Sequence, residues 1–130
     1  MHIYKNINQN IEYIKNINHN SSDIVSRIID NNNLKVGYVY LESVTSDDKV
    51  SEFLTKSIIG KKIKEITNNL ENNIYNSHIS TINNLDDAFY YLSSGFTLIF
   101  LDKTDICITV ETRMSLDRGI VESTSEPIIR

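Results

Sequence analysis

The sequence predicts an α/β fold of the α+β type, with three to four helices packed on a mixed β-sheet of about five strands. Two patterns lead to this prediction. Several segments repeat apolar residues every three or four positions, as amphipathic helices do, and others alternate or concentrate apolar residues, as strands do. The predicted order is helix, strand, strand, helix, helix, strand, helix, strand, strand. A sheet covered by helices buries the apolar side of every one of these elements.

Residues 1–20 are predicted to form a helix that docks on the rest of the domain. Isoleucines spaced by three or four positions form one narrow apolar stripe, made of Ile3, Ile7, Ile11, Ile14 and Ile17. The asparagines between them lower the helix propensity, so packing has to stabilise this helix. Docking on the domain's own core is the favoured interpretation, and a helix that binds a partner or dimerises is the alternative.

A β-hairpin is predicted next. Asparagines at 31–33 favour a turn, because asparagine tolerates a positive φ and hydrogen-bonds to its own backbone. Residues 34–41 alternate as a strand does, with one face formed by Val36, Tyr38 and Tyr40 and the other by Val39 and Leu41. The pattern of residues 23–30 fits a helix as well as a strand. A hairpin of residues 23–30 with residues 34–42 is favoured.

Two helices follow the hairpin. The first is capped by Thr45 or Ser46 and stopped by Gly60, and its predicted buried face comprises Val50, Phe53, Leu54, Ser57 and Ile58. The second covers residues 62–75, and its inward side chains are Ile63, Ile66, Leu70 and Ile74.

The rest of the predicted domain contains three strands and one helix. Residues 77–82 form a short strand. Asn84 caps a helix that Gly95 terminates, and the side chains predicted to face the core are Leu85, Ala88, Phe89 and Leu92. The nearly continuous apolar run at 96–101 indicates a strand covered on both faces, and residues 106–110 return as the last strand.

Composition argues against several classes of function. The net charge of −4 is unfavourable for bulk attraction to nucleic acid or to anionic lipid. A single cysteine, Cys107, excludes an intrachain disulfide. No apolar run approaches the roughly 18 to 20 residues that a membrane-spanning helix needs.

No catalytic, cofactor or metal site is predicted. The three histidines, His2, His19 and His78, are isolated, and Cys107 lies inside a strand as a small buried residue. The acidic pairs Asp47–Asp48 and Asp86–Asp87 fall in first helical turns, where carboxylates stabilise the helix. The sequence therefore indicates a domain that works through contacts and is not an enzyme. The alternative is a regulatory domain that binds a small molecule in a groove lined by Tyr38, Tyr40, Tyr90 and Tyr91.

The C-terminal residues 112–130 have neither helical nor strand periodicity. Positive and negative charges are interspersed along this segment. The charged side chains are the candidate interaction residues Arg113, Asp117, Arg118, Glu122, Glu126 and Arg130. Such a segment is either a solvated linker or an ordered connector whose ion pairs clamp two parts of a larger protein. We expect three regions: the helix at 1–20, an α/β subdomain at 21–111, and a charged connector at 112–130 that leads to a second subdomain outside this chain.

Three motifs resemble those of the N-terminal domain of the A subunit of GerA-type spore germinant receptors. Ser21–Arg27 is similar to that family's Ser-Ser-Asp-hydrophobic-hydrophobic-x-Arg segment, and Val39–Leu41 falls at its apolar strand. Residues Arg118–Arg130 resemble its Arg-x-Ile-x-Glu-Pro-x-x-Glu-x-Val-hydrophobic-Arg motif. This chain departs from the pattern at Glu42 and Ser43, where Asp-Gly is usual, and at Ser123, where proline is common. Stage V sporulation protein AF shares the architecture and is the alternative within the family.

The resemblance implies a receptor subunit and no enzymatic activity. Its expected partners are B-type and C-type receptor subunits and the remainder of the same subunit, with self-association as a further option. Its expected place is the spore inner membrane, reached only through a transmembrane region outside this chain, with this soluble domain on the cytoplasmic (core) side. The expected role is assembly of the receptor and coupling of nutrient sensing to ion release in germination.

Overall fold

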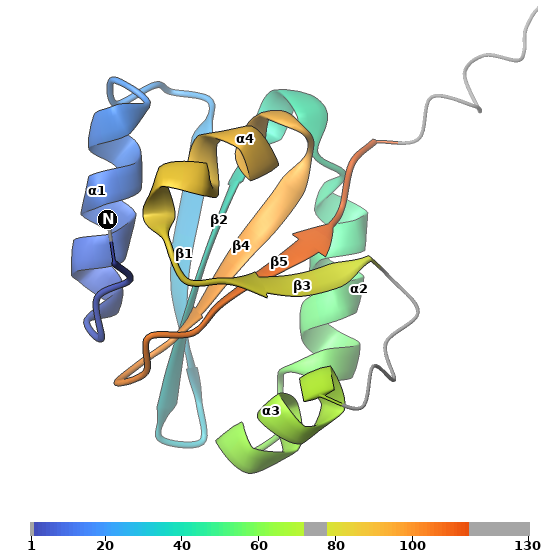
Figure 1. Ribbon diagram of the computed structural model, residues 1–130. Coiled ribbons are helices and arrows are strands. Elements are labelled where there is room, and N and C mark those ends of the chain that lie inside the picture. Colours follow the sequence, from blue (N-terminus) through green and yellow to red (C-terminus); the bar gives the residue numbers. More distant parts are fainter. Residues whose placement is uncertain (1, 72–77, 115–130) are drawn as a thin grey trace, which may run out of the picture.

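The computed structural model describes residues 2–71 and 78–114 and shows one β-sheet between two layers of helices (Figure 1). The predicted α+β class and element order are confirmed. The sheet contains five strands, which are β1 (Ile24–Asn31), β2 (Leu34–Leu41), β3 (Ile79–Ile82), β4 (Phe96–Leu101) and β5 (Cys107–Glu111). None of the described helices is long and apolar enough to cross a membrane.

The strand order is β1-β2-β4-β5-β3, and every described pair is antiparallel, although a mixed sheet was expected. The β1–β2 and β4–β5 turns are too short for the crossover that a parallel pair requires. At the first of these turns, Asn32 and Asn33 have φ angles of 49° and 70°. The ambiguous segment 23–30 is therefore a strand, and the favoured hairpin is confirmed.

Helices cover both faces of the sheet. On one face lie α1 (Ile7–Ile17) and α4 (Ala88–Ser93), and on the other lie α2 (Asp47–Ser57) and α3 (Ile63–Glu71) (Figure 1). Strand β4 separates the two cores, because Leu98 and Phe100 face α1 and α4 while Ile99 and Leu101 face α2 and α3. The prediction that residues 96–101 form a strand covered on both faces is confirmed.

The helix caps follow the predicted pattern with two refinements. Ser46, and not Thr45, caps α2, with its side chain accepting a hydrogen bond from the Lys49 backbone N–H. The helix after Asn84 begins as a 3₁₀ turn, η2 (Leu85–Asp87), and continues as α4.

The predicted inward position of Phe89 is wrong, since its side chain is 53% exposed. A 3₁₀ turn has about three residues per turn instead of 3.6. The face that starts at Leu85 therefore continues through Ala88 and Leu92, which are fully buried, and Phe89 lies beside that face.

Helix α1 packs against β2 at a glycine. The stripe of isoleucines faces the sheet, and a Cβ atom on Gly37 would overlap with Cγ2 of Ile7 and lie 3.5 Å from Cδ1 of Ile11. Glycine at this position thus lets the helix approach the strand closely.

Gly37→Ala is expected to lower the free energy of unfolding by about 1–2 kcal/mol, because the branched side chain of Ile7 has to move away. A double-mutant cycle with Ile7→Ala, measured by urea unfolding, checks the cause. The double variant should lose less free energy of unfolding than the sum of the losses in the two single variants. Strictly additive losses would contradict the steric explanation.

Candidate interaction site

The C-terminal segment leaves the fold through a short ordered stretch, residues 111–114, which we call the connector base. Beyond the end of β5, Thr112 is only 1% exposed. Its backbone N–H and its hydroxyl both donate to the Gly95 carbonyl, at 3.2 and 3.0 Å, and its hydroxyl lies 2.8 Å from that of Thr97. The chain is therefore still part of the domain at Thr112.

A second segment flanks the connector base on its other side. The Ser46 N–H donates to the Thr112 carbonyl at 2.8 Å, and the Met114 N–H donates to the Val44 carbonyl at 3.2 Å. Thr45 and Arg113 form an isolated antiparallel bridge between these two bonds. The connector base thus joins β5 to the segment that leads into α2.

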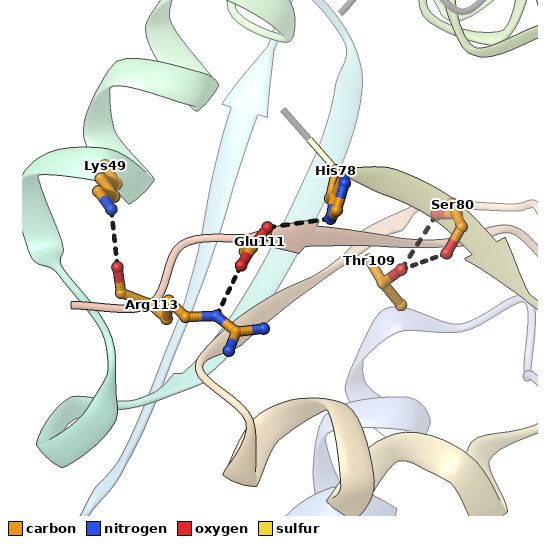
Figure 2. Close-up of polar contacts among 6 residues, drawn as sticks. All are labelled: Lys49, His78, Ser80, Thr109, Glu111 and Arg113. Carbon is orange, nitrogen blue, oxygen red and sulfur yellow. Dashed lines mark hydrogen bonds and ion pairs between the residues drawn. The ribbon is translucent and has the colours of Figure 1, made fainter. Parts of the chain in front are cut away.

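Charged side chains gather around the connector base, as Figure 2 shows. Glu111 accepts from two sides: Arg113 Nε lies 2.6 Å from Oε2, and His78 Nδ1 lies 3.1 Å from Oε1. The ammonium group of Lys49, from α2, donates a hydrogen bond to the Arg113 carbonyl at 2.9 Å. The Arg113 guanidinium also lies 5.7 Å from the centre of the Phe96 ring, within cation–π range.

Buried hydrogen bonds hold this stretch more firmly than its ion pairs do. The side chains of Arg113 and His78 are 52% and 85% exposed, and pairs of that kind contribute about 0.2–1 kcal/mol each. A hydrogen bond contributes about 0.5–1.5 kcal/mol net, and leaving a buried group without its partner costs about 1–3 kcal/mol. Thr112 and Thr97, both 1% exposed, are therefore the stronger anchor.

Gly95 gives the connector base the space that it needs. Its φ of 88° confirms the predicted helix-terminating role. In addition, a Cβ atom on Gly95 would lie 2.5 Å from Cβ of Arg113 and 2.9 Å from both Cα of Arg113 and the Val44 carbonyl oxygen. A side chain cannot be accommodated, because two of these three atoms belong to the backbone.

Thr45 has a buried hydroxyl for which no hydrogen-bond partner is found among the described residues. Thr45→Val keeps the shape and removes this polar group, so we expect the free energy of unfolding to rise by about 1 kcal/mol. Thr97→Val is the matched control, since its hydroxyl is bonded to Thr112, and it should lower stability. Urea unfolding measures both, and destabilisation by Thr45→Val would contradict the assignment.

Of the predicted interaction residues, only Arg113 lies within the described part of the chain. Its ion-pair partner, Glu111, belongs to the same domain. The other five, Asp117, Arg118, Glu122, Glu126 and Arg130, lie outside the described residues. Sequence reasoning missed Glu111, Lys49 and Thr112, which no motif or spacing distinguishes.

The described residues contain no group of three side chains suited to bind a metal ion. Cys107 is fully buried, as predicted, and burial raises the pKa of its thiol. The four tyrosines of the predicted groove do not meet. Tyr38 and Tyr40 stack on the α2 and α3 face, whereas Tyr90 and Tyr91 belong to α4 on the opposite face.

Comparisons with known proteins support the resemblance. The family described as Bacillus/Clostridium GerA spore germination protein matches residues 12–130. Among solved structures, the fold is similar to the N-terminal domain of the A subunit of the Bacillus megaterium spore germinant receptor GerK3. The TM-score is 0.70 at 18% identity, and the match covers 85% of this chain and 95% of that one. No curated protein matches the chain.

Proposed function

Because the chain belongs to the GerA spore germination protein family, as its motifs indicated, we propose that it is the N-terminal domain of a germinant receptor A subunit. In this proposal the domain contributes to assembly of the receptor and couples nutrient sensing to ion release. Its partners are B-type and C-type subunits and the remainder of its own subunit. The receptor would lie in the spore inner membrane, with this domain on the core side.

One observation carries the proposal: the connector base is built into the fold. Thr112 is buried, and residues 112–114 are hydrogen-bonded both to the helix-terminating Gly95 and to the segment before α2. A force or displacement acting on the chain after Met114 would therefore reach the β-sheet and α2 directly. Packed and hydrogen-bonded elements of this kind carry energetic coupling between parts of a protein.

The charges beyond the connector base would supply the contacts. Arg118, Glu122 and Glu126 fall in the motif shared with the family. Because they carry both signs of charge, they favour a partner surface that also presents both signs. Arg113 already forms an ion pair with Glu111 inside the described part of the domain. We therefore assign recognition to the charges after Met114 and anchoring to residues 111–114.

The test is germination of spores that carry the intact subunit with Arg118→Gln, Glu122→Gln and Glu126→Gln combined. We expect nutrient-triggered release of spore-core ions to be lost or delayed at least tenfold, because both the partner contacts and their coupling depend on these charges. Immunoblotting of the receptor subunits separates failed assembly from failed coupling.

The control removes the same number of charges on the N-terminal side of the domain, with Lys5→Gln, Glu12→Gln and Lys15→Gln; Lys5 and Glu12 are exposed and Lys15 is partly exposed. These side chains are far from the connector base in the chain and should leave germination unchanged. Normal germination and normal subunit levels in the triple connector variant would overturn the proposed role of the connector.

A further inference from the structure

We propose that the β3 edge of the sheet is a docking site for an extended, basic polypeptide segment, which adds to the sheet as a sixth strand. This inference is independent of the connector and of the proposed receptor role. It rests on a groove that runs along the free edge of β3, between the two helical layers.

The groove has a volume of about 850 Å³ and is open to solvent along β3. Leu70 and Glu71 from α3 form one wall, Asp87 from η2 forms the opposite wall, and Asp105 lies at the β4–β5 turn. Strand β3 itself forms the floor, at the outer edge of the sheet (Figure 1). The groove thus lies beside the last strand of the sheet, with residues of α3 and η2 in its lining.

The backbone of β3 offers free hydrogen-bonding groups to this groove. The Glu111 N–H donates to the His78 carbonyl, so residues 78 and 111 form a hydrogen-bonded pair of the antiparallel ladder. Hydrogen-bonded and non-hydrogen-bonded pairs alternate. Ile79 and Thr81, paired with Val110 and Ile108, therefore direct their N–H and C=O groups away from β5. An exposed edge of this kind is a template for another strand.

Charge decides which strand fits. The described residues that line the groove include three carboxylates, Glu71, Asp87 and Asp105, and no positively charged side chain. None of the three forms an ion pair with another described residue. Between them lie partly buried apolar side chains, Leu70 and Ile79 on the α3 side. The occupant is therefore a strand that alternates apolar residues with lysine or arginine, so that its apolar face meets Leu70 and Ile79 and its cationic face meets Asp87 on the opposite wall.

The direct test titrates the isotope-labelled 130-residue chain with a synthetic peptide of alternating valine and lysine, capped at both ends. We expect saturable amide shifts at Ile79–Ile82 in NMR spectra, and slowed exchange of the Thr81 amide hydrogen. A peptide in which glutamate replaces lysine should bind at least tenfold more weakly. Equal binding of the two peptides, or no shift at β3 with the basic one, would overturn the proposal.

Two variants separate strand addition from general attraction of charge. Thr81→Pro removes an outward N–H without touching the β3–β5 ladder, and proline is tolerated at such edge positions. It should weaken binding at least tenfold, whereas Thr81→Val should not. Asp87→Asn combined with Asp105→Asn should also weaken binding. Glu12→Gln on α1 combined with Glu52→Gln on α2 is the control that removes the same charge outside the groove. Full binding by Thr81→Pro would contradict the proposal. Concentration-dependent shifts at β3 without peptide would also contradict it, because they would identify a second copy of this chain as the occupant.

Discussion

Gly95→Ala is expected to lower the free energy of unfolding by about 3 kcal/mol or more. A non-glycine residue in the left-handed region costs about 1–2 kcal/mol, and Gly95 has a φ of 88°. Overpacking adds about 1–3 kcal/mol, because the new Cβ atom meets the backbone of Arg113 and the Val44 carbonyl at 2.9 Å. Neither group can move without breaking the hydrogen bonds of the connector base.

Gly60→Ala is the matched control for this prediction. Gly60 also follows a helix, α2, and has a positive φ of 84°, but apart from its two chain neighbours no residue comes within 4 Å of the place that a Cβ atom would take there. Only the backbone cost remains, so we expect a loss of about 1–2 kcal/mol. Urea unfolding gives both values, and amide shifts of residues 112–114 should change in Gly95→Ala alone. Equal losses in the two variants would show that the close approach to Arg113 has no energetic role.

The second large effect is a loss of stability at high pH that depends on Tyr40. This side chain is 8% exposed, and its hydroxyl donates to Asp47 Oδ1 at 2.7 Å. Burial, together with that hydrogen bond, raises the pKa of Tyr40 to about 12, from 10.0. The phenol then keeps its proton in the folded state at a pH where the unfolded chain releases it.

The direction in which stability changes with pH follows from this difference in pKa between the folded and unfolded states. Below pH 10 both states hold the proton and the full stability is present; as the pH rises from 10 through 12, proton release favours the unfolded state. Two pKa units correspond to about 2.7 kcal/mol at most. Unfolding free energies measured from about pH 8 to 12 should therefore fall more steeply for the native chain than for Tyr40→Phe.

A second tyrosine supplies the control. Tyr90 is 68% exposed, and Tyr90→Phe should leave the pH dependence of the native chain unchanged. Burial also raises the pKa of the Cys107 thiol, which is present in every one of these proteins, so only the difference between each variant and the native chain is interpreted. Parallel curves for the native chain and Tyr40→Phe would contradict the raised pKa.

Local patterns determined most of the elements of this protein. The alternation in residues 34–41 places Val36, Tyr38 and Tyr40 on one face of β2, as predicted, and α2 buries its predicted stripe. These predictions succeed because the periods of helix and strand are backbone properties that the sequence displays directly. The prediction that Phe89 faces the core was wrong for a local reason as well. The 3₁₀ turn before α4 changes the helical period, and no sequence pattern that we recognise indicates that change.

The candidate site was predictable only in part. The irregular charged segment and its family motifs pointed to the region after β5, and Arg113 is its one described member. The anchor came from elsewhere in the chain: Gly95 follows α4, Lys49 belongs to α2, and Thr97 belongs to β4. The sequence does not indicate which residue a given threonine or lysine will contact in the folded protein.

The sequence by itself determined the order of the elements, the type and buried face of most of them, and the family. The tertiary structure alone decided that every described strand pair is antiparallel, that β3 lies at the edge beside β5, and that the connector base is held between Gly95 and the segment before α2. The physical reason is the range of the interactions. Helix caps, turns and periodicity act over a few residues, whereas strand order and the close approach at Gly95 arise when the two helical layers pack on a shared sheet.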